Sequence, residues 1–153
     1  MDLVLWRHAE AFDLTAGQDD LERALTPKGE RQAARIAQWL DRRLPDGARI
    51  LVSPARRAQQ TAQPLGRRIR TSDAIAPGGD VDALLTAAHW PRAGGTVVIV
   101  GHQPTLGLVV ARLLAGEERS WTIRKGAVWW LRHRVRGGQA QVVLEAVQAP
   151  GFV

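Results

Sequence analysis

Apolar runs and amphipathic segments follow one another along the chain in the order that predicts strands alternating with helices. Three runs have the composition of buried strands: LVLW at 3–6, RILVSP at 49–54 and TVVIVGH at 96–102. A strand whose centre has no polar position is covered on both faces, which is typical of parallel sheets in α/β proteins. We therefore expect these strands in the interior of a mostly parallel sheet.

Polar and apolar positions recur at helical spacing between these strands. TP at 26–27 and SP at 53–54 each place a hydroxyl residue before a proline, as an N-cap precedes the first helical turn, so helices are predicted to begin there. Asp80 is expected to cap a third helix, and a fourth is predicted over residues 104–114. Pro64 lies inside the second helical pattern and should kink or shorten that helix.

The C-terminal part of the chain has the alternation of an antiparallel hairpin. AVWWLRHRV at 127–135 and AQVVLEAVQ at 140–148 flank a Gly137-Gly138 turn. Together with the preceding elements, this pattern predicts one α/β domain over residues 1–153. Its expected architecture is a three-layer α/β/α sandwich, whose mostly parallel sheet carries an antiparallel hairpin at its edge.

The composition is that of a globular protein. Apolar residues make up 45% and charged residues 24% of the 153 positions, which disfavours disorder. The chain has no cysteine, so disulfides and thiolate metal sites are excluded. No segment approaches membrane-spanning length, and the N-terminal apolar stretch is too short for a signal peptide. We expect a soluble, cytoplasmic protein without a membrane partner.

The formal charge of +6 comes almost entirely from arginine, since Lys28 and Lys125 are the only lysines. A basic protein raises the question of nucleic-acid binding. The arginines, however, are scattered over polar positions of amphipathic segments, and the sequence has neither a run of five or six like charges nor a nucleic-acid-binding motif. We interpret most of them as solvated helix faces and expect no nucleic-acid partner.

Cationic and imidazole side chains follow three of the predicted strands, at the point where each strand ends. Arg7 and His8 follow the first, Arg56 and Arg57 lie just beyond the second, and His102 ends the third of the runs named above. The carboxyl ends of parallel strands open on the same side of a sheet, so these side chains are predicted to meet in one crevice. Guanidinium groups bind phosphoryl oxygens in a bidentate manner, one imidazole can act as a nucleophile, and the other can stabilise charge in the transition state.

Two other interpretations remain open for these residues. Zinc could use two histidines, but the sequence offers no cysteine, no H-E-x-x-H and no third ligand at useful spacing, so we expect no metal. The site could also belong to a binding module that grips phosphate groups of nucleic acid or of a phosphoprotein without catalysis. That alternative calls for an aromatic stacking row, whereas Trp121, Trp129 and Trp130 are expected to pack under the hairpin. We interpret His89 and His133 as structural.

Four stretches resemble motifs of the histidine phosphatase superfamily, which has the phosphoglycerate mutase-like fold. LWRHAEA resembles its Arg-His-Gly signature, RALTPKGERQA its Leu-Thr-x-x-Gly segment, SPARRAQQTA its Ser-Pro-x-x-Arg-Ala-x-x-Thr block, and VVIVGHQPTLG its late Gly-His block. The resemblance runs from the first strand to the fourth helix. Chain length, the lack of large insertions and the Arg-x-Leu-Thr sequence at 23–26 make the chain similar to the small SixA-type phosphohistidine phosphatases.

The resemblance implies a role for each residue at the strand ends. His8 would be the nucleophile that becomes phosphorylated, while Arg7, Arg57 and His102 would hold the phosphoryl oxygens and Arg23 would reach the site from its loop. It also implies a phosphatase that needs no metal or organic cofactor and works through a phosphohistidine intermediate. The substrate expected is phosphohistidine in a protein, such as a histidine-containing phosphotransfer domain; the alternative is a small phosphoester or nucleotide at the same site.

The chain departs from the family pattern at two points. Ala9 replaces the usual glycine after the nucleophile, and positive φ is disfavoured there. The glutamate acid of larger relatives has no counterpart after the second helix, so we predict Glu10 as the general acid, ahead of Asp19 and Asp20. The imidazole of phosphohistidine leaves more readily than an alkoxide, so a site with weak acid catalysis should favour phosphoramidate substrates.

Overall fold

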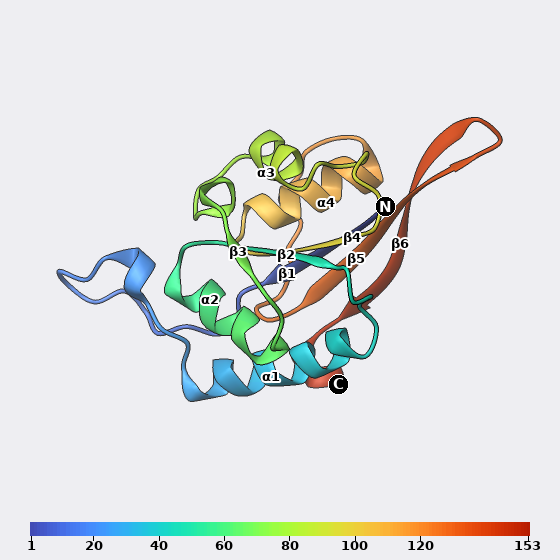
Figure 1. The fold of residues 1–153 in the computed structure, drawn as a ribbon. Helices are drawn as coiled ribbons and strands as arrows, with labels where there is room; N and C mark the ends of the chain where they lie inside the picture. Colours follow the sequence, from blue (N-terminus) through green and yellow to red (C-terminus); the bar gives the residue numbers. More distant parts are fainter.

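Six strands form one sheet, and the computed structural model describes all 153 residues of the chain (Figure 1). Neighbours among the first four strands run parallel, whereas the last two run antiparallel and end the sheet at one edge. The predicted mostly parallel sheet with an antiparallel edge hairpin is therefore confirmed. In the order β3-β2-β4-β1-β5-β6, the sheet consists of β1 (Asp2–Arg7), β2 (Arg49–Val52), β3 (Arg70–Thr71), β4 (Thr96–Gly101), β5 (Val128–Arg136) and β6 (Gln139–Gln148).

Helices cover both faces of this sheet, which confirms the predicted three layers. Figure 1 shows α1 and α2 on one face and α3 and α4 on the other. Alternate residues of β1 enter opposite cores: Val4 and Trp6 pack with α1 and α2, and Leu3 and Leu5 pack with α3 and α4. None of the helices has the length and apolar character needed to cross a membrane. The helices are α1 (Pro27–Asp41), α2 (Arg56–Ala62), α3 (Val81–Ala87) and α4 (Thr105–Ala115), with 3-10 turns η1 (Asp20–Glu22), η2 (Gln63–Leu65), η3 (Asp73–Ile75) and η4 (Pro150–Phe152).

Two of the three predicted helix caps are confirmed, and one is wrong. The side chain of Thr26 accepts a hydrogen bond from Gly29 N at 3.0 Å, and Asp80 Oδ1 accepts one from Ala83 N at 2.8 Å. Ser53 does not cap α2, because α2 begins three residues later and has Ala55 as its N-cap. The Ser53 hydroxyl instead lies against His102 in the interior. Pro64 shortens the second helix as predicted, since α2 ends before it and gives way to η2.

The tryptophans considered as a stacking row pack into the two cores instead. Trp121 and Trp129 lie with their ring centroids 6.4 Å apart against the core beneath α3 and α4. Trp130 belongs to the opposite core, where its ring meets that of Trp39 edge-on at 6.4 Å. Successive residues of β5 therefore send their rings to opposite faces of the sheet, and no aromatic row forms.

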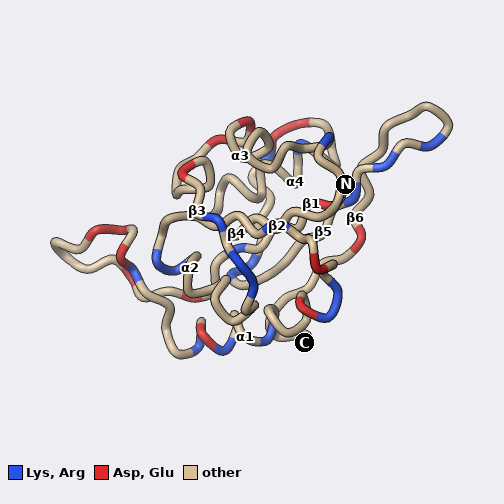
Figure 2. The backbone as a smooth tube through the Cα atoms, in the orientation of Figure 1, with Lys and Arg blue, Asp and Glu red and all other residues tan.

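A loop between β1 and α1 projects from the body of the sandwich (Figure 1). We call residues 12–24 the β1–α1 loop; pairing of Ala11 with Leu25 closes its base. The loop exposes Phe12, Leu14 and Leu21 to solvent. Figure 2 shows acidic residues along it, and it shows Lys and Arg dispersed over several elements rather than gathered on one. The β5–β6 hairpin projects from the other side of the molecule (Figure 1).

Candidate active site

The side chains predicted to meet at the strand ends do lie in one cavity. Arg7, His8, Arg57 and His102 line a hollow of about 220 Å³, and Arg23 reaches it from the β1–α1 loop. Parallel β1, β2 and β4 bring them together, because each strand opens at the same edge of the sheet. The remaining lining residues are Ala11, Asp13, Pro77, Gln103 and Lys125.

His8 is held in one tautomer by the backbone. Its Nδ1 lies 2.7 Å from the carbonyl oxygen of Ala9. A carbonyl can only accept, so Nδ1 of the neutral ring carries the hydrogen and Nε2 carries the lone pair. Burial lowers the pKa of His8 to about 4, and the charges of Arg57 and Arg7 act in the same direction. The imidazole is therefore neutral at pH 7, with Nε2 available as a nucleophile.

Arg7 and Arg57 are each anchored in the cavity through Nη1 of the guanidinium group. Arg7 donates from Nη1 to the backbone oxygen of Ile123 at 2.8 Å, and Arg57 donates from Nη1 to the backbone oxygen of Asp20 at 2.8 Å. Neither Nε has a partner, although both are buried. Burial lowers the pKa of both groups, but a guanidinium stays charged at neutral pH. Each arginine thus keeps its Nε–Nη2 edge for an anion.

His102 lies beside His8, with the ring centroids 5.1 Å apart. Its Nε2 is 2.7 Å from the hydroxyl oxygen of Ser53, while its Nδ1 is buried and has no partner. Burial lowers the pKa of His102 to about 3, and neighbouring His8 and Arg57 add to this effect. His102 is consequently neutral at pH 7 and presents Nδ1 without a partner.

Only three buried side-chain nitrogen or oxygen atoms in the protein lack a hydrogen-bond partner: Arg7 Nε, Arg57 Nε and His102 Nδ1. All three belong to residues that line the same cavity. Leaving a buried polar atom unpaired costs about 1–3 kcal/mol, so such atoms are rare in folded proteins and call for an explanation. Their gathering in one polar hollow indicates that a ligand with several acceptor oxygens completes them.

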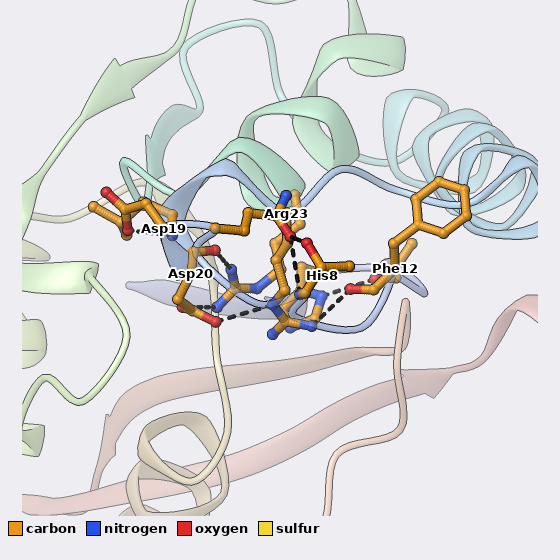
Figure 3. A network of polar contacts seen from close by, with 10 residues as sticks. His8, Phe12, Asp19, Asp20 and Arg23 are labelled. Carbon is orange, nitrogen blue, oxygen red and sulfur yellow. Dashed lines mark hydrogen bonds and ion pairs between the residues drawn. The ribbon is translucent and has the colours of Figure 1, made fainter.

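Asp20 ties two of the arginines together (Figure 3). Its Oδ2 accepts from Arg57 Nη2 at 3.0 Å, and its Oδ1 accepts from Arg23 Nε at 2.9 Å. Arg23 also donates from Nη1 to the backbone oxygen of Phe12 at 3.0 Å, which fixes it within the β1–α1 loop. Partial burial favours the protonated form of Asp20, but the hydrogen bonds from Arg57 and Arg23 outweigh it and lower the pKa. Asp20 is therefore an ionised carboxylate that orients arginines.

Glu10, the residue predicted as general acid, does not line the cavity. Its carboxylate accepts a hydrogen bond from the hydroxyl of Thr26 at 2.7 Å, at the beginning of α1. The backbone N–H of Glu10 is also engaged, by Gln32 Oε1 at 3.0 Å. The structure thus places this side chain at a helix start, and the carboxylate of the loop that lines the cavity is Asp13.

Ala9 occupies the position of the family's glycine without backbone strain. His89 is the only non-glycine residue with a positive φ, so Ala9 lies outside that region. Its methyl group is fully buried, and its N–H donates to the hydroxyl of Thr61 at 3.0 Å. Thr61 donates in turn to the backbone oxygen of Arg57 at 2.7 Å, so α2 fixes the peptide that follows His8.

The other histidines lie outside the cavity, and the ring of His133 packs edge-on against Trp90 at 5.7 Å. No group of three or more His, Cys, Asp or Glu side chains is arranged to hold a metal ion. Sequence reasoning missed Asp13, Gln103 and Lys125. Nothing in the local sequence distinguishes them from other polar loop residues, because only the folded loops bring them to the strand ends.

Comparison with known proteins identifies the family and the fold of the chain. Residues 3–77 match the family model of the histidine phosphatase superfamily, branch 1. The chain is 32% identical over 126 residues to phosphohistidine phosphatase SixA of Escherichia coli strain K12, an alignment that covers 76% of each protein. Among solved structures, it is similar to a SixA-type protein from Nakamurella multipartitia, with a TM-score of 0.79, 31% identity, and 97% of this chain and 95% of that one covered. The protein histidine phosphatase SixA in complex with tungstate superimposes with a TM-score of 0.80 at 25% identity, over 99% and 98% of the two chains.

Proposed function

We propose, from the premise that this chain belongs to the histidine phosphatase superfamily, that it is a phosphatase working through phosphorylated His8. We further propose that it removes phosphate from phosphohistidine in a protein, such as a histidine-containing phosphotransfer domain. The observation that carries the first part is the set of three unpaired buried nitrogens beside the free Nε2 of His8. A phosphoryl group supplies the acceptor oxygens with which these unpaired nitrogens can form hydrogen bonds.

The Nε–Nη2 edges of Arg7 and Arg57 match the spacing of two phosphoryl oxygens, and His102 adds a third contact. The SixA structure that superimposes on this chain holds tungstate, a tetrahedral oxyanion. An anion of that shape in this cavity would pair each of the three nitrogens. The positive charges of Arg7 and Arg57 then favour the charge that builds up on the equatorial oxygens during transfer.

The reaction proceeds in two displacements. Nε2 of His8 attacks phosphorus, the bond from phosphorus to the leaving group breaks, and the leaving group departs with the electron pair. Phosphorylation at Nε2 places positive charge on the ring, and the Ala9 carbonyl stabilises it through the Nδ1 hydrogen. Water then attacks phosphorus, the electron pair of the P–Nε2 bond returns to Nε2, and the proton lost by water leaves with phosphate.

Two features support a phosphohistidine protein over a small phosphoester. Asp20 is held ionised by its arginines, and Glu10 is engaged at α1, so neither of these predicted acids donates a proton to the leaving group, and Asp13 is the one acidic residue that lines the cavity. An imidazole leaving group tolerates this better than an alkoxide, because its nitrogen is protonated easily. The cavity also opens beside the exposed apolar residues of the β1–α1 loop, where the surface of a protein substrate could rest.

A substrate panel tests the proposal. Purified protein is assayed against a phosphorylated histidine-containing domain, a small phosphoramidate, sugar phosphates and nucleotides, with His8→Ala in parallel. We expect turnover of the phosphoprotein and phosphoramidate with the wild type and none with His8→Ala. Preference for a sugar phosphate or nucleotide would establish the alternative substrate class at the same site, and phosphate binding without any turnover would establish the binding module.

A further inference from the structure

The hydroxyl of Ser53 lies between two hydrogen-bonding groups in a fully buried position. Ser53 has 0% exposure, its Oγ is 2.7 Å from His102 Nε2, and the backbone N–H of Ala55 donates to the same oxygen at 3.2 Å. These are the only hydrogen bonds of that oxygen. Solvent does not reach it, so these two partners decide how the hydroxyl is used.

The hydrogens available to the Ser53 hydroxyl determine the direction of its hydrogen bond with His102. Ala55 N can only donate, so it occupies a lone pair of the Ser53 oxygen. The remaining hydroxyl hydrogen needs an acceptor, and the only one within reach is Nε2 of the neutral imidazole. In the opposite arrangement, Nε2–H would donate to Ser53 and the hydroxyl hydrogen would stay buried without an acceptor.

We propose that Ser53 is a positioning residue that donates its hydroxyl hydrogen to His102 Nε2 and so holds His102 as the Nδ1–H tautomer, with that N–H directed into the cavity. His8 and His102 then share one tautomer but present opposite sides to the ligand. The hydrogen bond between Nδ1 of His8 and the Ala9 carbonyl leaves the lone pair of His8 Nε2 facing the site. The hydrogen bond from Ser53 to Nε2 of His102 leaves the Nδ1–H of His102 facing the same site. Whether this N–H stabilises a phosphoryl oxygen rests on the proposed function; the tautomer itself does not.

Nitrogen-15 NMR of the histidine side chains tests the tautomer directly. Long-range proton–nitrogen correlations on the wild type at pH 7 should show His102 as the Nδ1–H form, and Ser53→Ala should shift the ring toward the Nε2–H form or a mixture. An Nε2–H tautomer in the wild type, or an unchanged tautomer in Ser53→Ala, would overturn the proposal. This measurement needs no substrate, so it fails or succeeds separately from the phosphatase assignment.

Kinetics supply the second test, with Gln59→Ala as the matched control. Gln59 Nε2 donates to the backbone oxygen of Ser53 at 2.8 Å, so this variant disturbs the same residue without touching its hydroxyl. Losing an oxyanion donor costs about 10²–10³ in kcat; because Ser53 acts through His102, we expect Ser53→Ala to lose about 10-fold to 100-fold in kcat, with KM changed less. Ser53→Cys, which retains a donor, should recover part of that loss. Equal losses in Gln59→Ala and Ser53→Ala would show a merely structural role and contradict the proposal.

Discussion

Asp20 holds Arg57 by two bonds at once, from its backbone oxygen to Nη1 at 2.8 Å and from its carboxylate to Nη2 at 3.0 Å. These bonds occupy the Nη1–Nη2 edge of the guanidinium, and the Nε–Nη2 edge remains for the ligand. The Arg57 side chain is only 4% exposed, and Asp20 is the only acidic residue that pairs with it. The β1–α1 loop, through Asp20, therefore sets the orientation of an arginine that belongs to α2.

Asp20→Asn should weaken phosphate binding and lower turnover without unfolding the protein. A hydrogen bond to a charged group is worth about 1.5–3 kcal/mol, and the partial exposure of Asp20 reduces this, so we expect a loss on the order of tenfold in kcat/KM and weaker inhibition by vanadate. Asp19→Asn is the matched control, because the Asp19 carboxylate accepts only from Leu21 N and pairs with no arginine. Tighter vanadate binding by Asp20→Asn would mean that the carboxylate competes with the anion instead of positioning Arg57.

His8→Ala should abolish both turnover and the trapping of labelled phosphate on the protein. Removing the nucleophile of a covalent mechanism lowers kcat by on the order of 10³-fold or more. His133→Ala serves as control, because that ring packs against Trp90 outside the cavity. Rapid acid or base quench of a reaction with labelled phosphoramidate measures the trapped intermediate, which should be stable to base and labile to acid. A His8→Ala protein with most of its activity would rule out the proposed mechanism.

The strand ends and most caps could be predicted from the sequence, because they depend on local patterns. Apolar runs define where β1 and β4 stop, and the parallel arrangement then dictates that Arg7 and His102 meet. The cap role predicted for Ser53 is wrong for the opposite reason, and the predicted acid Glu10 lies outside the cavity for that reason as well. A serine before a proline has the local chemistry of a cap, yet in the folded protein its hydroxyl forms a hydrogen bond with His102. Glu10 follows the nucleophile closely in sequence, but its carboxylate accepts a hydrogen bond from Thr26 at the beginning of α1.

Acidic pH should destabilise the folded protein through its two neutral histidines. The pKa values of His8 and His102 are about 4 and about 3 in the folded state, against an ordinary value near 6.5 in the unfolded chain. Between these values the unfolded state binds more protons, so the free energy of unfolding falls as pH drops from about 6.5 toward 4, by at most about 1.4 kcal/mol per pH unit for each histidine. Above pH 7 this contribution is fully present and constant.

Urea denaturation at several pH values, on the wild type and on His8→Asn/His102→Asn, isolates this effect from the carboxylates. The double variant should lose less stability than the wild type over the same interval. Identical pH dependence for the two proteins would show that the histidines are not held neutral in the fold.

Gly29→Ala should destabilise the protein by about 1–3 kcal/mol, the usual cost of overpacking. Gly29 is at the first turn of α1, and a Cβ built there overlaps the backbone carbonyl of Glu10. That contact brings α1 against the peptide that follows the nucleophile, which gives the Leu-Thr-x-x-Gly motif a physical reason. Gly47→Ala is the control, because a Cβ there meets nothing within 4 Å. The measurement is the urea midpoint; equal midpoints for the two variants would contradict close packing at Gly29.

The exposed apolar residues of the β1–α1 loop should matter for a protein substrate and not for a small one. Phe12 and Leu14 are each 54% exposed, on the loop that also supplies Asp13 and Arg23 to the cavity. Truncating an apolar contact in an interface costs about 1–2 kcal/mol, so Phe12→Ala/Leu14→Ala should lower kcat/KM for a phosphohistidine domain by on the order of tenfold. Hydrolysis of a small phosphoramidate should be unchanged, because its phosphoryl group needs only the cavity.

Val135→Ala/Leu144→Ala removes comparable exposed apolar surface on the distant hairpin and should affect neither substrate. If the loop variant slowed both substrates equally, the loop would act on the cavity and not on the partner.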